Sequence, residues 1–157
     1  MHTASEAIAW PLQGEGVGVS RGQREGDDEL RAANLRNEAR LWAAREQLYT
    51  TGLSRQQAAE RVSVRPNQID DLLRDGDLLA LDGPDGLRLP RWQFDPDTRR
   101  GRLEGIAEVV SAFPGGVLAL SSWMAAPNAA LGGRTPRQAL IDGEVDQVTA
   151  AASHHGA

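Results

Sequence analysis

The sequence predicts a mainly α-helical protein in which a helix-turn-helix with a small β-hairpin wing is followed by a small all-helical domain. Three observations carry this prediction. Apolar residues recur at helical spacing in five or six segments. Two short helical patterns are separated by only three residues. One loop rich in glycine and proline lies between two strand-like runs, which is typical of a hairpin.

Composition narrows the class of protein. The chain has 157 residues, which favours one domain or two very small ones. It contains no cysteine, so disulfides, thiolate zinc sites and a cysteine nucleophile are excluded. No apolar run approaches the ~20 residues of a membrane helix, and the first residues lack the basic start and apolar stretch of a signal peptide. We therefore expect a cytoplasmic protein with no membrane partner.

The charge is unevenly distributed along the chain. The net charge is −5, and all 17 basic residues are arginine, whose planar fork suits phosphate and carboxylate. Residues 31–102 contain thirteen arginines and eleven acidic residues, a net charge of +2, whereas both flanking segments are acidic. A strong non-specific nucleic-acid binder would be far more basic than this.

The N-terminal residues 1–28 are predicted to be a disordered arm. Glycine and charged residues are frequent there and no apolar periodicity survives, apart from the short apolar island Ile8–Leu12, which is either a docking peptide or a plain tail. A helix is expected from Asp28 to about Tyr49, with acidic residues at its start and Gly52 after its end. Its apolar residues belong either to the core or to a dimer contact. The region 29–94 is thus predicted to combine this helix with the winged helix-turn-helix.

The helix-turn-helix follows directly. Ser54 and Gln57 have the spacing of a capping box at the start of the first helix. Ser63–Arg65 is the short connection, Pro66 suits the first position of the second helix, and Gly76 ends that helix.

A hairpin is expected between Leu78 and Leu89, and because it follows the second helix it is interpreted as a wing. Asp70, Asp71 and Asp75 on the second helix repel phosphates, so the alternative is a degenerate helix-turn-helix that serves dimerisation or docking. The residues expected to contact DNA lie at the start of the helices and on the wing. They are Arg55, Arg65, Asn67, Gln68, Arg88 and Arg91.

The last third, residues 95–152, is predicted to be a separate helical domain. Apolar patterns indicate one helix from about Arg102, a second over residues 117–124, a third capped by Thr135 with Pro136 at its first position, and a fourth over residues 144–152. Residues 153–157 are expected to form a flexible tail.

The most specific motif is the run Trp123–Pro136, which contains a Pro-Asn step and the sequence Leu-Gly-Gly-Arg-Thr-Pro, and which is followed by Asp142-Gly143 before a closing helix. This run resembles the toxin-binding domain of the Xre/MbcA/ParS antitoxin family, and the likeness covers about residues 92–152. Gly132-Gly133 permits a sharp turn, and Arg134 at that corner either ties loops together or meets a carboxylate of a partner. Trp123 either belongs to the hydrophobic core or contacts the partner directly.

The resemblance implies a non-enzymatic antitoxin that pairs with a RES-domain toxin consuming NAD. The C-terminal domain would cover the entrance of the toxin's active site, and a homodimeric or larger complex would bind operator DNA. The sequence departs from the family in its N-terminal half, which looks more like an excisionase or MerR winged helix than an Xre-like bundle. Partly from this resemblance, and partly because rigid turns, arginine and tryptophan suit an interface, we predict a set of toxin-binding residues that includes the tail. They are Trp123, Asn128, Leu131, Arg134, Thr135, His154 and His155.

No catalytic constellation or cofactor motif is found in the sequence, so no enzyme activity, cofactor or metal is expected. The histidines are His2, His154 and His155, and the adjacent pair lacks the spacing of a helical metal site. Two other functions stay open: a stand-alone winged-helix transcription regulator without a toxin, and a purely structural dimerisation protein.

Overall fold

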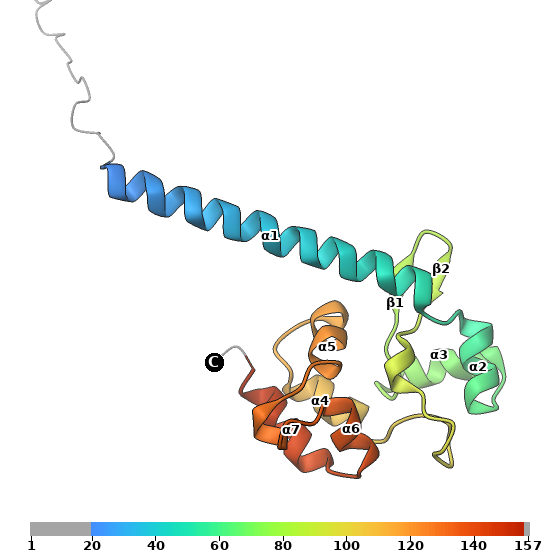
Figure 1. Cartoon of the computed structure of the whole chain (residues 1–157). Helices are drawn as coiled ribbons and strands as arrows, with labels where there is room; N and C mark the ends of the chain where they lie inside the picture. The colour runs from blue at the N-terminus through green and yellow to red at the C-terminus, as the bar shows by residue number, and fades with distance from the viewer. Residues whose placement is uncertain (1–19, 156–157) are drawn as a thin grey trace, which may run out of the picture. The chain divides into compact units, whose positions relative to one another are not determined.

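A computed structural model describes residues 20–155. The mainly α-helical fold class with one small hairpin is confirmed (Figure 1). The described residues divide into two units, 20–40 and 41–155. The first unit is represented in the described residues by the beginning of α1. The second holds all the other elements.

The helix α1 (Arg21–Thr51) begins earlier than expected. The sequence predicted a disordered arm up to residue 28, but residues 21–28 are helical because Ser20 and Gln23 form a capping box. The Gln23 N–H donates to Ser20 Oγ over 3.2 Å, and the Ser20 N–H donates to Gln23 Oε1 over 3.0 Å. An ion pair of 3.2 Å between Arg21 and Glu25 adds to the first turn. The rest of the predicted arm, including Ile8–Leu12, lies outside the described residues.

Most apolar side chains of α1 are exposed. Leu30, Leu35, Leu41 and Trp42 keep 62%, 61%, 42% and 66% of their surface accessible, and Leu48 is the only residue of this helix in the core. Leu41 and Trp42, which belong to the second unit, are therefore not part of its core. The dimer contact stays a prediction.

The helix-turn-helix elements are α2 (Arg55–Val62) and α3 (Pro66–Arg74), which pack against each other. Ser54 caps α2 with Gln57 as predicted. Ser63 turns the chain in the left-handed region at φ 58°. Ala58, Ala59 and Ile69 are almost fully buried, so the small alanines allow the two helices to approach closely.

The hairpin is shorter than predicted. Strands β1 (Leu81–Gly83) and β2 (Gly86–Arg88) pair antiparallel, with Leu81 opposite Arg88. The run expected to start at Leu78 is not a strand there, because Leu78 is 1% exposed in the core and Leu79 is bonded instead to a glutamine side chain. That glutamine, Gln93, lies in the short helix η3 (Arg91–Gln93).

The C-terminal helices are α4 (Ile106–Ala112), α5 (Val117–Met124), α6 (Pro136–Ile141) and α7 (Val145–Ser153), with the short helix η4 (Ala129–Leu131) before α6. Helix α7 packs on α4, α6 and η4. Thr135 caps α6 by accepting from the Gln138 N–H over 3.1 Å. These helices form as predicted, except that the first begins at Ile106, after a loop.

The boundary predicted after residue 94 is not where the chain divides. Residues 41–155 are one compact unit, and a single hydrophobic cluster contains both Ile69 of α3 and Leu103, Ile106 and Leu120 from the C-terminal third. Gln93 and Phe94, at the expected boundary, are 0% and 3% exposed. A domain boundary falls in exposed chain with few contacts across it, and this segment is the opposite.

Within residues 20–155, no single helix is both long and apolar enough to cross a membrane. Only α4 and α5 taken together, bent by 112°, reach that length and composition.

Candidate functional site

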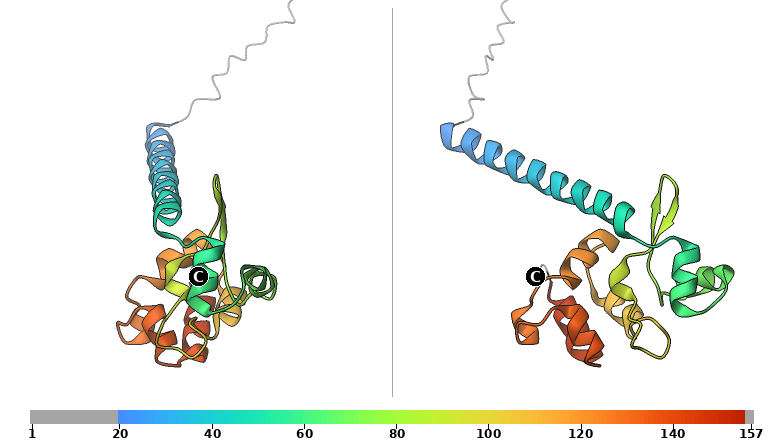
Figure 2. Two further views of the ribbon diagram at one scale, coloured as in Figure 1. Left: turned by 90° about the vertical axis from the view of Figure 1, so that its right-hand side faces the viewer. Right: turned by 45° about the vertical axis from the view of Figure 1, so that its right-hand side comes forward.

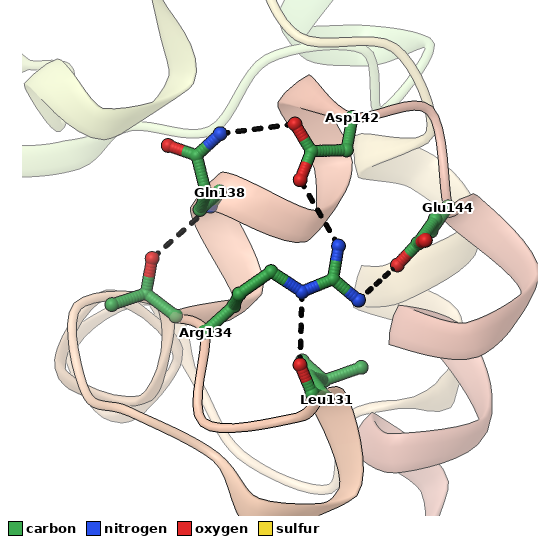
Figure 3. A network of polar contacts seen from close by, with 6 residues as sticks. Leu131, Arg134, Gln138, Asp142 and Glu144 are labelled. Carbon is green, nitrogen blue, oxygen red and sulfur yellow. Dashed lines mark hydrogen bonds and ion pairs between the residues drawn. The ribbon is translucent and has the colours of Figure 1, made fainter.

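Arg134 lies at the centre of a polar network that joins three segments of the C-terminal region (Figure 3). Its Nε donates to the Leu131 carbonyl over 2.9 Å, its Nη1 to Asp142 over 3.0 Å, and its Nη2 to Glu144. The hydrogen bonds to Glu144 and then to Asp142 raise the pKa of Arg134 above its ordinary value. Of the two roles left open by the sequence, the structure gives Arg134 the tying of loops, and contact with a partner stays a prediction.

The same network fixes the loop from Asn128 to Arg134. The Asn128 N–H donates to the Arg134 carbonyl over 3.0 Å, and the Gly133 N–H donates back to the Asn128 carbonyl over 2.9 Å. Asn128 Oδ1 accepts from the Ala130 N–H over 2.9 Å and so caps η4. Gly132 and Gly133 have φ of 70° and 86°, which glycine adopts without strain. The conspicuous sequence motif is therefore a rigid turn.

Three more of the predicted toxin contacts have structural positions. Trp123 and Leu131 belong to the core, with 8% and 1% of their surface exposed. Thr135 is the cap of α6. The side chains of Trp123 and Leu131 are packed in the core, and the Thr135 hydroxyl accepts from the Gln138 N–H.

An open hollow of 570 Å³ lies beside this rigid turn. It brings together residues from the end of α5, from η4 and from α7. Four of the predicted toxin-binding residues line it, which are Trp123, Asn128, His154 and His155. The other lining residues are Ala130, Gln147, Ala150 and Ala151. This α5–α7 hollow is the candidate protein-binding site.

The tail closes one side of the hollow. The His155 ring stacks on Phe113, with ring centres 4.9 Å apart and planes 18° apart, and lies 6.1 Å from the Trp123 ring. His154 Nδ1 is 2.8 Å from the Ala150 carbonyl. Residues 153–155 were predicted to be a loose tail, but these contacts hold them against α5 and α7. Residues 156–157 lie outside the described part of the chain.

Sequence reasoning missed the contribution of α7 to this hollow. Gln147, Ala150, Ala151 and His154 have the spacing i, i+3, i+4, i+7 and therefore share one helix face. This spacing can be read from the sequence. It does not indicate a binding site, however, because small and polar residues share one face of any solvent-facing helix. Only the position of α7 beside η4 turns that face into the floor of a hollow.

The predicted DNA-binding residues fall into separate groups, and the first lies at α2 and α3. Arg55 pairs with Asp70 over 3.2 Å, so an acidic residue of α3 already neutralises it. Gln68 Oε1 accepts from the Arg65 N–H over 2.8 Å, which makes Gln68 part of the cap of α3. Arg65 and Asn67 are exposed at the start of α3.

Arg88 and Arg91 form the second group, at the C-terminal end of α1. Arg91 Nε donates to the Thr51 carbonyl, and Arg88 Nη1 donates to the Leu87 carbonyl over 2.9 Å. A Cβ added at Gly52 would lie 3.2 Å from the Cβ of Arg88, so strand β2 and the end of α1 are in contact. Both arginines therefore make hydrogen bonds to backbone carbonyls, and the structure does not join them to the start of α3.

No group of three or more potential metal ligands is found among residues 20–155. No protein-family model matches this chain, and no curated protein or solved structure shows significant similarity to it.

Proposed function

We propose that this chain is the antitoxin of a toxin–antitoxin pair, a cytoplasmic binding protein without catalytic activity whose α5–α7 hollow receives part of a RES-domain toxin. One observation carries the proposal. Four of the predicted toxin-binding residues, from two segments 26 residues apart in sequence, line the same open hollow (Trp123, Asn128, His154 and His155).

The physical character of the hollow supports a protein as its occupant. Three of its eight lining residues are alanines (Ala130, Ala150 and Ala151), which lose no side-chain entropy when a partner covers them. Its walls are fixed before binding, because the Asn128–Arg134 turn is closed by hydrogen bonds at both ends and His155 is stacked on Phe113. A preformed concave surface of this kind reduces the ordering cost of association.

The toxin-binding proposal is tested with a matched pair of variants. Ala150 lies exposed in the hollow, and Ser111 is an exposed residue of α4 that does not line it. Ala150→Arg fills the hollow, whereas Ser111→Arg makes the same charge change elsewhere. Each variant is co-expressed with the product of the adjacent reading frame, which the proposal expects to be a RES-domain protein, and co-purification and NAD consumption are measured.

We expect Ala150→Arg to weaken toxin binding at least tenfold, which corresponds to about 1.4 kcal/mol, and to restore NAD consumption. Ser111→Arg is expected to behave as the parent. Deletion of residues 153–157 should restore toxin activity more than it loosens binding, if the tail reaches the NAD pocket. The proposal fails if no RES-domain protein co-purifies with the parent chain, or if Ala150→Arg inhibits as well as the parent.

A second function, repression of the operon through DNA binding by a homodimer or larger complex, is favoured by the packing of α2 against α3 across a three-residue turn. A stand-alone regulator would share this function but would have no toxin. Binding of the purified parent chain to a duplex from the region upstream of its own reading frame tests DNA binding without the toxin.

A further inference from the structure

Four exposed arginines gather where the helix-turn-helix meets the loop of residues 94–102. Arg61 is at the end of α2, Arg65 precedes α3, and Arg99 and Arg100 lie in the loop. We call these four residues the arginine surface. Figure 2 shows the loop beside α2 in the right-hand view, in yellow next to green.

Contact between the loop and α2 is direct. Gly101 has φ of 72°, and a Cβ added to it would lie 2.4 Å from the Arg61 carbonyl and 3.2 Å from the Cα of Val62. Only glycine allows the loop backbone to approach so closely. Arg99 and Arg100 are therefore placed next to the C-terminal end of α2 by backbone packing.

Hydrogen bonds hold the loop in one shape. Asp95, which is 7% exposed, accepts at Oδ1 from the Asp97 N–H over 3.0 Å, and its own N–H donates to the Gly101 carbonyl over 3.1 Å. The Thr98 hydroxyl lies 2.9 Å from the Asp95 carbonyl and 3.1 Å from the Arg102 carbonyl. The loop thus holds the backbone of two arginines in place before any ligand binds.

The guanidinium groups of this surface differ from most others in the chain. From residue 41 onward in the described part, the arginine side chains that have neither an ion pair nor a hydrogen bond are Arg45 and these four. The acidic residues within four positions of these arginines are Glu60, Asp95, Asp97 and Glu104, and none of them forms an ion pair with the four guanidinium groups. Several unengaged arginine forks on a fixed scaffold suit a ligand with several separate phosphates.

We propose that the arginine surface binds backbone phosphates of duplex DNA, and that the loop of residues 94–102, rather than the predicted wing, clamps the DNA beside the helix-turn-helix. This inference rests on the DNA-binding part of the proposed function. It assigns phosphate contact to Arg61, Arg99 and Arg100, none of which the sequence indicated, and retains Arg65. It also gives Gly101 a positioning role.

The central experiment compares two double variants of the full chain. Arg99→Gln with Arg100→Gln removes two charges from the surface, and Arg21→Gln with Arg24→Gln removes two exposed charges from the start of α1 as a control. Fluorescence anisotropy measures the Kd for a duplex from the upstream region and for an unrelated duplex, at sodium chloride concentrations between roughly 50 and 200 mM.

For both duplexes we expect Arg99→Gln/Arg100→Gln to bind at least tenfold more weakly, because two charge-assisted hydrogen bonds are lost. The slope of log affinity against log salt should fall by roughly two, about 0.9 for each lost phosphate contact. The control should keep the parent slope. Gly101→Ala, which retains every arginine but forces the loop away from α2, should also weaken binding while circular dichroism shows an intact helical fold.

The outcomes separate this inference from the function on which it rests. If the parent binds DNA, and Arg99→Gln/Arg100→Gln binds it equally well with an unchanged salt dependence, the loop of residues 94–102 does not contact DNA. The proposal that the chain binds DNA then stands. If the parent binds neither duplex, both are wrong. If the double variant retains DNA binding but loses the toxin, the arginine surface is a protein contact and the inference is overturned.

Discussion

At the scale of single residues, Arg134 and Trp123 are both held by contacts within the chain. Arg134 was equally compatible with loop tying and partner contact, and its three hydrogen bonds within the chain assign it the first role. Trp123 is buried against Phe113, with ring centres 5.4 Å apart. The residues left available in the hollow are the inconspicuous ones, such as Ala150 and Gln147.

Arg134 gives a prediction about stability. Arg134→Lys keeps the charge but cannot donate in three fixed directions, because lysine carries a single ammonium group on a flexible stem. We expect a lower Tm for Arg134→Lys and a still lower one for Arg134→Ala, measured by circular dichroism. Arg45→Ala, which removes an exposed arginine that has neither an ion pair nor a side-chain hydrogen bond, should leave Tm unchanged. Equal Tm values for all four proteins would contradict the structural role.

The two tryptophans Trp123 and Trp42 provide a matched comparison, since one is 8% and the other 66% exposed. Trp123→Ala should lower the free energy of unfolding by about 3–5 kcal/mol, because it leaves a cavity in the core. Trp42→Ala should change it by no more than about 0.5 kcal/mol. Urea unfolding followed by circular dichroism measures both. A small effect of Trp123→Ala would show that this side chain is not part of the core.

At the scale of elements, helix starts were predictable wherever a capping residue was recognised. Ser54 and Thr135 cap α2 and α6 at the predicted positions. The same serine–glutamine pattern occurs at Ser20 and Gln23. Because the surrounding residues are rich in glycine, the sequence predicted a start at Asp28 instead. Local capping chemistry therefore outweighed the glycines Gly22 and Gly26 in the first turns.

The two equivalent caps should differ in what they stabilise. Ser54→Ala should lower the free energy of unfolding by about 1 kcal/mol, because α2 is packed into the core. Ser20→Ala should instead fray the first turn of α1 without altering the main transition, since no residue there is buried. Hydrogen exchange at residues 21–26 and urea unfolding distinguish the two effects. A shift of the main transition by Ser20→Ala would contradict this.

At the scale of the whole molecule, the winged region and the C-terminal helices depend on one another. Gln93 links them: its side chain bonds to the N–H and the carbonyl of Leu79 over 2.6 and 2.8 Å, and its own carbonyl accepts from the Leu103 N–H over 2.8 Å. Arg137 of α6 donates to the carbonyls of Trp92 and Phe94 over 2.9 and 3.0 Å. The hydrophobic cluster is continuous across this junction.

A fragment experiment follows from this shared core. Residues 29–94 and 95–157, separated at the boundary that the sequence predicted, should each fail to unfold cooperatively, because each exposes apolar surface that the other covers. The full chain should show one main transition for residues 41–155. Gln93→Ala should cost about 1–3 kcal/mol, because it leaves the part-buried N–H and carbonyl of Leu79 without these partners. Cooperative unfolding of either fragment would refute a shared core.

The sequence by itself determined the fold class, the order of the helices, the capped starts of α2 and α6 and the turn at Gly132-Gly133. These features depend on interactions between residues three or four positions apart, which a sequence displays directly. Tertiary structure alone decided that Arg134 bonds to Asp142 and Glu144, that α7 and η4 enclose a hollow, and that Gly101 brings two arginines to the end of α2. Such features depend on which distant segments pack together, and many sequences with the same local pattern would pack them differently.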